Sequence, residues 1–220
     1  MSESARSNLA AAVAGLPPLE TAEDVAAALG GLVGARHLEL PFPASGRTAA
    51  RFDALSDVSA ADLSLGRLAE GHTDARAILA EARIPPRWND VTYGVWAAEP
   101  PDARVTAERT PAGWILRGRK RYASGARGID RALVTAACAD GGRLFDVDVR
   151  GAGAYVVEDS WRAVGMAATE SLEVVFDGVT VGEADSVGPP GFYLERPGFW
   201  HGAVGVAACW YGGALARCAC

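Results

Sequence analysis

The sequence predicts an α+β protein in which an N-terminal helical segment is followed by a small antiparallel β-barrel and then by the start of a C-terminal helical domain. Within residues 1–92 apolar side chains recur at steps of three and four, which is the period of an amphipathic helix. Within residues 93–187 the period changes to two and turn residues recur at short intervals, which is typical of an antiparallel barrel or sandwich. Within residues 188–220 the helical pattern returns. We therefore predict three domains with these boundaries.

The first two helices are indicated by apolar spacing and by capping residues. Leu9, Val13 and Leu16 follow helical steps, and the prolines that come next end the segment, because proline cannot continue a helix. Thr21 is followed three positions later by Asp24, an arrangement similar to a capping box. We expect a second helix to begin after Thr21.

The clearest helical pattern begins near Ser59, with Asp62 again three positions later. The apolar stripe that follows consists of Leu65, Leu68, His72, Ala75, Leu79 and Ala82. The stretch Pro85-Pro86 ends this helix. His72 is the polar member of the stripe, and we interpret it as a hydrogen-bonded core histidine at a helix packing contact rather than as a catalytic group.

Strands are expected after Trp88. The stretch 110–113 carries Pro and Gly at the second and fourth positions, which suits a type I turn. The stretch 139–142 is a second hairpin signal, and Asp177-Gly178 indicates a turn or a bulge. The expected strands are residues 105–109, 114–124, 132–138, 145–149, 154–157 and 172–181.

The last predicted helix, residues 199–216, is rich in Ala, Gly and aromatic residues and is almost free of charge. A helix that is apolar all round belongs inside a larger structure. The sequence offers nothing that could cover this helix fully, so we expect an exposed apolar surface, and large surfaces of that kind mark partner sites.

Composition excludes several classes of function. The net charge of −6 argues against nucleic acid or an anionic membrane surface as the main partner. No apolar run is long enough to span a bilayer, and the polar N-terminus is unlike a signal peptide. The four cysteines follow neither a zinc pattern nor a redox-pair pattern, so we expect no metal site and read them as thiols of a reducing cytoplasm.

Three stretches of the predicted barrel together resemble one family. Residues 93–100 read YGVWAAEP, residues 113–126 read GWILRGRKRYASGA, and residues 161–171 read WRAVGMAATES, with VVFDGVTV following at 174–181. They are similar, in the same order, to the Thr-Glu-Pro, Gly-x-x-Leu-x-Gly-x-Lys-x-aromatic-x-Ser/Thr and Gly-Met-x-x-Thr-x-Ser segments of acyl-CoA dehydrogenase flavoproteins. The chain therefore resembles the N-terminal helical domain and the middle barrel domain of that family.

The resemblance implies FAD as the cofactor, with its ring against the barrel. The implied cofactor-binding residues are Trp96, Ala97, Ala98, Tyr122, Ala123 and Ser124. By the resemblance, the backbone of Ala97 and Ala98 meets the polar edge of the ring and Tyr122 lies against its face. Ser124 is implied to donate a hydrogen bond to the ring nitrogen that accepts hydride. Without the resemblance, Tyr122 and Ser124 would be interpreted as a strand-end aromatic and a turn residue.

The sequence also departs from the family pattern. Ala98 replaces the Thr of Thr-Glu-Pro, and Pro101-Asp102 follows where the family has Gly-Ser-Asp. These changes remove a hydroxyl that commonly faces coenzyme A and one possible flavin contact. The matching Glu99 is structural in the family. The family's catalytic base belongs to a C-terminal helical domain and would lie beyond Cys220, so we assign no catalytic residue and expect that domain to be largely missing.

Two classes of function remain open. The first is an FAD-dependent oxidoreductase that desaturates an acyl thioester, or a related small molecule, since relatives with this fold also act as flavin monooxygenases. The second is a non-catalytic partner subunit or scaffold of the same fold. The expected partners are a small-molecule substrate, acyl-CoA among them, and either further copies of this chain or a complete relative.

Overall fold

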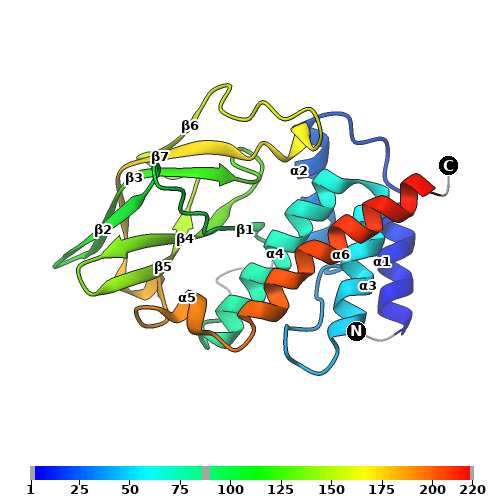
Figure 1. Cartoon of the computed structure of the whole chain (residues 1–220), viewed down its shortest axis with the longest axis horizontal. Coiled ribbons are helices and arrows are strands. Elements are labelled where there is room, and N and C mark those ends of the chain that lie inside the picture. Colours follow the sequence, from blue (N-terminus) through cyan, green and yellow to red (C-terminus); the bar gives the residue numbers. More distant parts are fainter. Residues whose placement is uncertain (1–2, 86–89, 219–220) are drawn as a thin grey trace.

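A computed structural model describes residues 3–85 and 90–218, and it separates helices from strands (Figure 1). The helices are α1 (Glu3–Ala14), α2 (Ala22–Gly34), α3 (Thr48–Ala61), α4 (Leu63–Glu81), α5 (Phe192–Glu195) and α6 (Phe199–Cys218). The strands are β1 (Tyr93–Trp96), β2 (Val105–Thr110), β3 (Gly113–Ala123), β4 (Arg131–Cys138), β5 (Gly141–Asp148), β6 (Ala154–Val157), β7 (Leu172–Val181) and β8 (Ser186–Val187). The α+β class is confirmed. Pro86, Trp88 and Cys220 lie outside the described residues.

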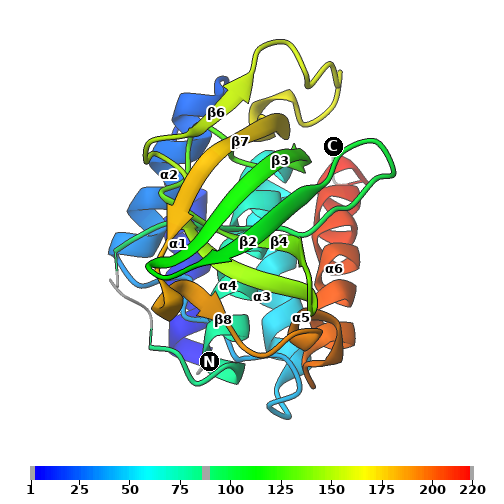
Figure 2. The same ribbon diagram turned by 90° about the vertical axis from the view of Figure 1, so that its left-hand side faces the viewer.

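The strands form a single mixed sheet in the order β6-β7-β3-β2-β4-β5-β8, with β1 added parallel to β4. Most neighbours are antiparallel. The predicted barrel is not confirmed, because β6 and β8, which end the order, do not pair with each other within the described residues. Both are short, four and two residues, and so offer few backbone groups for closure. In Figure 2 the open sheet stands in front of the helices.

The predicted turns are confirmed. Strands β2 and β3 pair as a hairpin from Thr110↔Gly113 onward, and β4 and β5 pair from Cys138↔Gly141. Between β3 and β7 the register shifts at Leu116/Arg117, where Gly178 is the extra residue on β7. Gly178 has φ +73°, which suits a bulge position that favours glycine.

One predicted helix start is confirmed and the other is wrong. Thr21 caps α2 and forms the capping box with Asp24. The helix predicted near Ser59 begins at Leu63, because the Asp62 side chain accepts a hydrogen bond from the Leu65 N–H at 2.7 Å. Ser59 is buried inside α3, a helix that the sequence pattern did not reveal.

Helix α6 packs against α3 and α4 through its glycines. Its buried positions are Gly202, Gly205, Cys209, Gly212 and Gly213. A Cβ added at Gly212 would overlap the carbonyl oxygen of Ser56, and one added at Gly213 would lie 2.5 Å from Leu63 Cδ2. The backbones therefore approach closely, and Trp200, Val204, Tyr211 and Leu215 of α6 are exposed on its outer face. Among the described residues, no helix has the length and apolar character that a membrane span requires.

The predicted division at residues 92/93 and 187/188 stays a prediction. One apolar core runs from α2, α3 and α4 into the inner face of the sheet, and it includes Leu29, Leu55, Leu68 and Phe145. A smaller cluster joins the C-terminal half of α4 to β1, β4 and β5. This second cluster fixes α4 against β1. A cavity lies at the C-terminal end of that strand.

Candidate functional site

Two adjoining cavities lie where the ends of β1 and β3 meet α4 and α6. Their volumes are about 360 and 430 Å³, within the range of small-molecule and cofactor sites. Four residues line both cavities: Arg67, Glu70, Tyr122 and Val206. The cavities therefore meet at Tyr122, between the sheet and the helices.

Tyr122 has a strained backbone conformation. Its φ is +61°, in the left-handed region that a bulky side chain rarely adopts. Its side chain is 54% exposed, although it contributes to both cavity walls. Backbone strain of this kind clusters at functional sites, where the surrounding structure holds it in place. The conformation turns the chain at the end of β3 and leaves the phenol ring uncovered.

Ser124 lies beside Tyr122 and begins a chain of hydroxyl groups. Its Oγ is 2.9 Å from Ser171 Oγ, which is 3.0 Å from Thr169 Oγ1. Thr169 donates its only hydroxyl proton to the Met166 carbonyl at 2.8 Å. Thr169 must therefore accept from Ser171, and Ser171 must accept from Ser124. Ser124 can donate into the cavity only if its hydroxyl turns away from Ser171, at a cost of about 1 kcal/mol.

The other predicted cofactor-binding residues take different positions. Ala97 and Ala98 line the 430 Å³ cavity at the end of β1. Trp96 and Ala123 line neither of the two cavities. Trp96 is buried and its Nε1–H donates to the Ser124 carbonyl at 3.0 Å, so it joins the ends of β1 and β3.

Glu99 lies away from these cavities and beside a buried lysine. Its Oε1 is 3.7 Å from Lys120 Nζ, which donates to Thr135 Oγ1 at 2.8 Å. Burial lowers the pKa of Lys120 to about 8, and the Glu99 carboxylate opposes that shift. This position favours the structural role that the resemblance implies for Glu99.

Glu70 is a buried carboxyl in the shared wall of the two cavities. One oxygen, Oε2, accepts from Arg67 Nη1 one turn earlier on α4, and Oε1 has no hydrogen-bond partner in the described part of the chain. Burial raises the pKa of Glu70, the Asp74 carboxylate raises it further, and Arg67 and Arg51 oppose the rise. Glu70 is therefore a carboxyl that can take up and release a proton beside the cavities.

A buried ion cluster holds the far wall of the larger cavity. Arg196 Nη2 contacts Asp74 Oδ2 at 3.1 Å, and its Nη1 contacts Glu81 Oε1 at 3.3 Å. The guanidinium also lies over the rings of Tyr193 and Phe199, at 5.8 and 5.9 Å from the ring centroids. Arg196 thus connects the segment before α6 to α4.

The helical wall was missed by the sequence analysis. Arg67, Glu70 and Asp74 form a charged stripe at helical spacing, and such a stripe usually faces solvent. Val206, Cys209 and Trp210 of α6 also line the 360 Å³ cavity, and the segment Gly165–Met166 does so as well. Of these wall residues, only Gly165 and Met166 were indicated by the sequence, as part of the family-like stretch 161–171.

His72 matches its interpretation as a core residue. It is 4% exposed, and its Nδ1 accepts a hydrogen bond from the Tyr93 N–H at 3.2 Å. The partner is a strand rather than the expected helix. Among residues 3–85 and 90–218, no group of three or more His, Cys, Asp or Glu side chains is arranged to hold a metal ion.

Comparison with known proteins identifies the fold. The chain is similar to the structure of TdsC from Paenibacillus sp. A11-2 with FMN and indole (24% identity, 90% of this chain and 62% of that chain, TM-score 0.65). It is also similar to nitrososynthase from Micromonospora carbonacea var. africana (20% identity, 98% of this chain and 64% of that chain, TM-score 0.73). A third similar structure is that of an FAD-dependent dehydrogenase (17% identity, 98% of this chain and 65% of that chain, TM-score 0.72). No protein-family model and no curated protein matches the chain.

The chain has the acyl-CoA dehydrogenase fold, which confirms the resemblance seen in the sequence. At these identities the likeness concerns the fold alone. The chain spans about two thirds or less of each of these solved structures, 62% to 65% of their lengths.

Proposed function

We propose that the protein is a flavin-dependent oxidoreductase whose isoalloxazine ring lies against Tyr122, with FAD as the expected flavin. The observation that carries the proposal is the uncovered, left-handed Tyr122 between two adjoining cavities. Solved structures of the same fold contain FMN, or FAD in the case of PigA with FAD and proline. The family motifs of β1 and β3 end at these cavities.

The residues present fit such a ring. The two cavities, of about 360 and 430 Å³, fall within the size range of cofactor sites, and the phenol of Tyr122 offers a face for offset stacking. Backbone groups at Ala97 and Ala98 suit the polar edge of the ring, since they need no side chain to reach it. Bound flavin supplies hydride or electron transfer, while the protein supplies position and hydrogen bonds. Ser124 holds its hydroxyl within reach of the same space.

Glu70 is the residue that we propose moves a proton during turnover. It lies on the helical side of the cavities, opposite the strand ends, and its Oε1 is not engaged by the Arg67 contact. A carboxyl with a raised pKa is suited to general acid–base chemistry near neutral pH. The charged and titratable groups around it are Arg67, Asp74, Arg51, Cys209 and Tyr193.

Two finer activities are distinguished by experiment. Desaturation of an acyl thioester predicts that an acyl-CoA reduces the bound flavin without oxygen. Monooxygenation predicts no such reduction, and oxygen-dependent product only after the flavin has been reduced by other means. One structure of the same fold is that of a dibenzothiophene monooxygenase. Pro101-Asp102 stands where the family has Gly-Ser-Asp, without the Ser that commonly faces coenzyme A, so we favour a small organic substrate over acyl-CoA.

Flavin retention tests the proposal. The purified chain is incubated with FAD or FMN, desalted, and its visible absorbance is recorded. We expect retained flavin in the native chain and a loss of roughly tenfold or more in affinity for Tyr122→Ala, because one stacked aromatic face is removed. Tyr155→Ala is the matched control, since Tyr155 is similarly exposed at 52% but lies on β6 away from the cavities. A folded chain that retains neither flavin would contradict the proposal.

A second candidate function is supported by α6. Its outer face exposes Trp200, Val204, Tyr211 and Leu215, each between 48% and 75% exposed. We propose that this face binds a second copy of the chain or a relative of the same fold, since large apolar patches mark contact surfaces. Light scattering after gel filtration tests this: association should fall in Trp200→Ser/Tyr211→Ser, and a native monomer would argue against it.

A further inference from the structure

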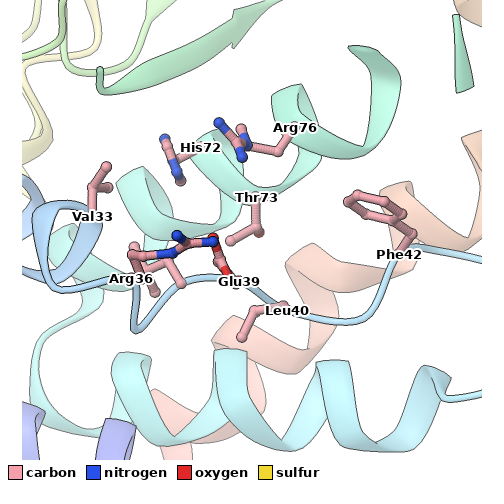
Figure 3. A pocket seen from close by; sticks show the side chains of 9 residues that line it. Val33, Arg36, Glu39, Leu40, Phe42, His72, Thr73 and Arg76 are labelled. Carbon is pink, nitrogen blue, oxygen red and sulfur yellow. The ribbon is translucent and has the colours of Figure 1, made fainter. Parts of the chain in front are cut away.

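A third cavity lies on a different face of α4 and shares no lining residue with the two flavin cavities. Its volume is about 250 Å³, which is room for several water-sized groups. Its walls are the 33–42 segment and the outer side of α4, with Val33, Arg36, Leu38, Glu39, Leu40, Phe42, His72, Thr73 and Arg76 as lining residues. In Figure 3, His72, Thr73 and Arg76 come from one helix, and Thr73 points toward the segment that carries Arg36, Glu39 and Leu40.

Two hydrogen-bond donors in this wall have no acceptor within the described part of the chain. His72 uses Nδ1 to accept from the Tyr93 N–H, so the neutral ring carries its proton on Nε2. Burial and the nearby Arg76 lower the pKa of His72 to about 3, so the ring stays neutral at physiological pH. The Nε2–H has no partner among the described residues. Arg76 Nη1 is buried and also has no hydrogen-bond partner there.

The other polar groups of the cavity are already engaged. The Glu39 carboxylate, the one acidic group in the lining, accepts from Arg36 Nε at 2.8 Å. Thr73 Oγ1 donates to the Glu70 carbonyl and accepts from Arg51 Nη2, both at 3.1 Å. Glu39 neutralises Arg36, so the lining keeps the positive charge of Arg76. The Nε2–H of His72 and the net positive charge of Arg76 therefore border a space that is also lined by apolar side chains.

We propose that this cavity binds a small organic anion, a carboxylate or a phosphate group with a short apolar part, through Arg76 and the Nε2–H of His72. An anionic oxygen would accept from the His72 Nε2–H, and a charge-assisted contact with the Arg76 guanidinium is among the stronger polar contacts. Leu38, Leu40 and Phe42 would border the apolar part of the ligand. The site is separate from the flavin cavities and does not depend on the proposed function.

The test follows the His72 side chain directly. Chain labelled with ¹⁵N-histidine is titrated with sodium phosphate and, separately, with sodium butyrate, each against sodium chloride at equal ionic strength. We expect the His72 Nε2 resonance to move saturably with at least one of the two anions, while that of the exposed His201 does not. Movement with phosphate alone, butyrate alone or both supports the site and identifies the anion class. His72→Asn assigns the signal, since its side chain can still accept from the Tyr93 N–H.

Arg76→Gln and Arg83→Gln form the matched pair of variants. Arg83 is exposed and lies outside the cavity, so both variants remove one positive charge but only the first changes the site. We expect binding to weaken roughly tenfold or more in Arg76→Gln, from the loss of a charge-assisted contact, and to be unchanged in Arg83→Gln. Equal binding in Arg76→Gln and native chain would overturn the proposal. A His72 resonance of the native chain that responds to neither anion would also overturn the proposal. This outcome does not depend on whether Arg76→Gln folds.

Discussion

Helices α4 and α6 lie side by side (Figure 1) but differ in the residues that they bury. Helix α4 buries polar groups, among them Glu70, His72, Thr73 and Asp74. Helix α6 buries mainly glycines and exposes tryptophan, tyrosine, valine and leucine. Helix α4 therefore buries polar groups in addition to its apolar residues, whereas α6 departs from the rule that apolar side chains face inward.

The difference separates two kinds of surface. The polar groups of α4 are held by partners such as Arg196, and where the described residues supply no partner, as at Glu70 Oε1 and His72 Nε2, a cavity is present. Polar atoms of buried residues that open onto a cavity without a protein partner are positions where a ligand can bind, so they indicate ligand chemistry. The exposed side chains of α6 carry no such cost and indicate a contact surface instead. Four substitutions test this comparison.

The largest expected effect is the loss of the ion cluster on α4. Arg196→Ala leaves Asp74 buried without its cation, and removal of one partner from a buried pair typically costs about 3–5 kcal/mol. Urea unfolding measures the change. Arg109→Ala, which breaks the exposed contact with Glu183, is the control and should cost less than about 1 kcal/mol. Equal losses of unfolding free energy in the two variants would mean that the buried ion cluster stabilises the fold no more than an exposed ion pair does.

The close packing of α6 is tested by adding a single methyl group. Gly212→Ala places a Cβ against the Ser56 carbonyl, and overpacking of this kind costs about 1–3 kcal/mol. Gly31→Ala is also a helical Gly→Ala change, but its Cβ would meet nothing within 4 Å, so it should stabilise by up to about 1 kcal/mol. Urea unfolding of both variants decides the point. A neutral Gly212→Ala would show that α6 can move away from α3.

The raised pKa of Glu70 predicts a pH-dependent effect of Glu70→Gln. The folded chain binds the Glu70 proton more tightly than the unfolded chain, so ionisation of Glu70 costs stability as pH rises above the ordinary value of 4.5. Glutamine cannot ionise, so the stability of Glu70→Gln relative to native chain should increase from pH 4 to pH 8. A tenfold difference in proton affinity between the folded and unfolded chains corresponds to about 1.4 kcal/mol.

Unfolding free energies of both chains at four or five pH values test this expectation. Loss of the Arg67 contact adds an offset that does not depend on pH in this range, so the slope is the informative quantity. A difference in unfolding free energy between Glu70→Gln and native chain that stays constant, or that favours the native chain as pH rises, would contradict a raised pKa of Glu70.

The smallest effect is expected on the outer face of α6. Trp200 is 75% exposed, and exposed substitutions usually change stability by less than about 0.5 kcal/mol. Thermal unfolding of Trp200→Ser at low protein concentration, where association is minimal, measures this value. A loss of several kcal/mol would mean that Trp200 is covered within the folded chain.

The sequence predicted the turns, the positions of Tyr122 and Ser124 at a strand end, and every strand except β8, because alternation and local motifs are encoded by neighbouring residues. It missed α3, which buries Arg51 among apolar groups, and it missed the role of the Arg67–Glu70 stripe. Both depend on which helices pack together, and residue type alone does not show that. The orientation of α6 was also hidden, since glycine allows a close approach that hydrophobicity does not measure.

Hydrogen–deuterium exchange of the chain with and without FAD tests the central claim most directly. The claim places the flavin at the ends of β1 and β3, so FAD should slow exchange of the amides in 95–98, 121–126 and 165–171. Exchange in α1 and in the β4–β5 turn should not change. Bound flavin that leaves all three segments unaffected while protecting another part of the chain would contradict the site proposed at Tyr122.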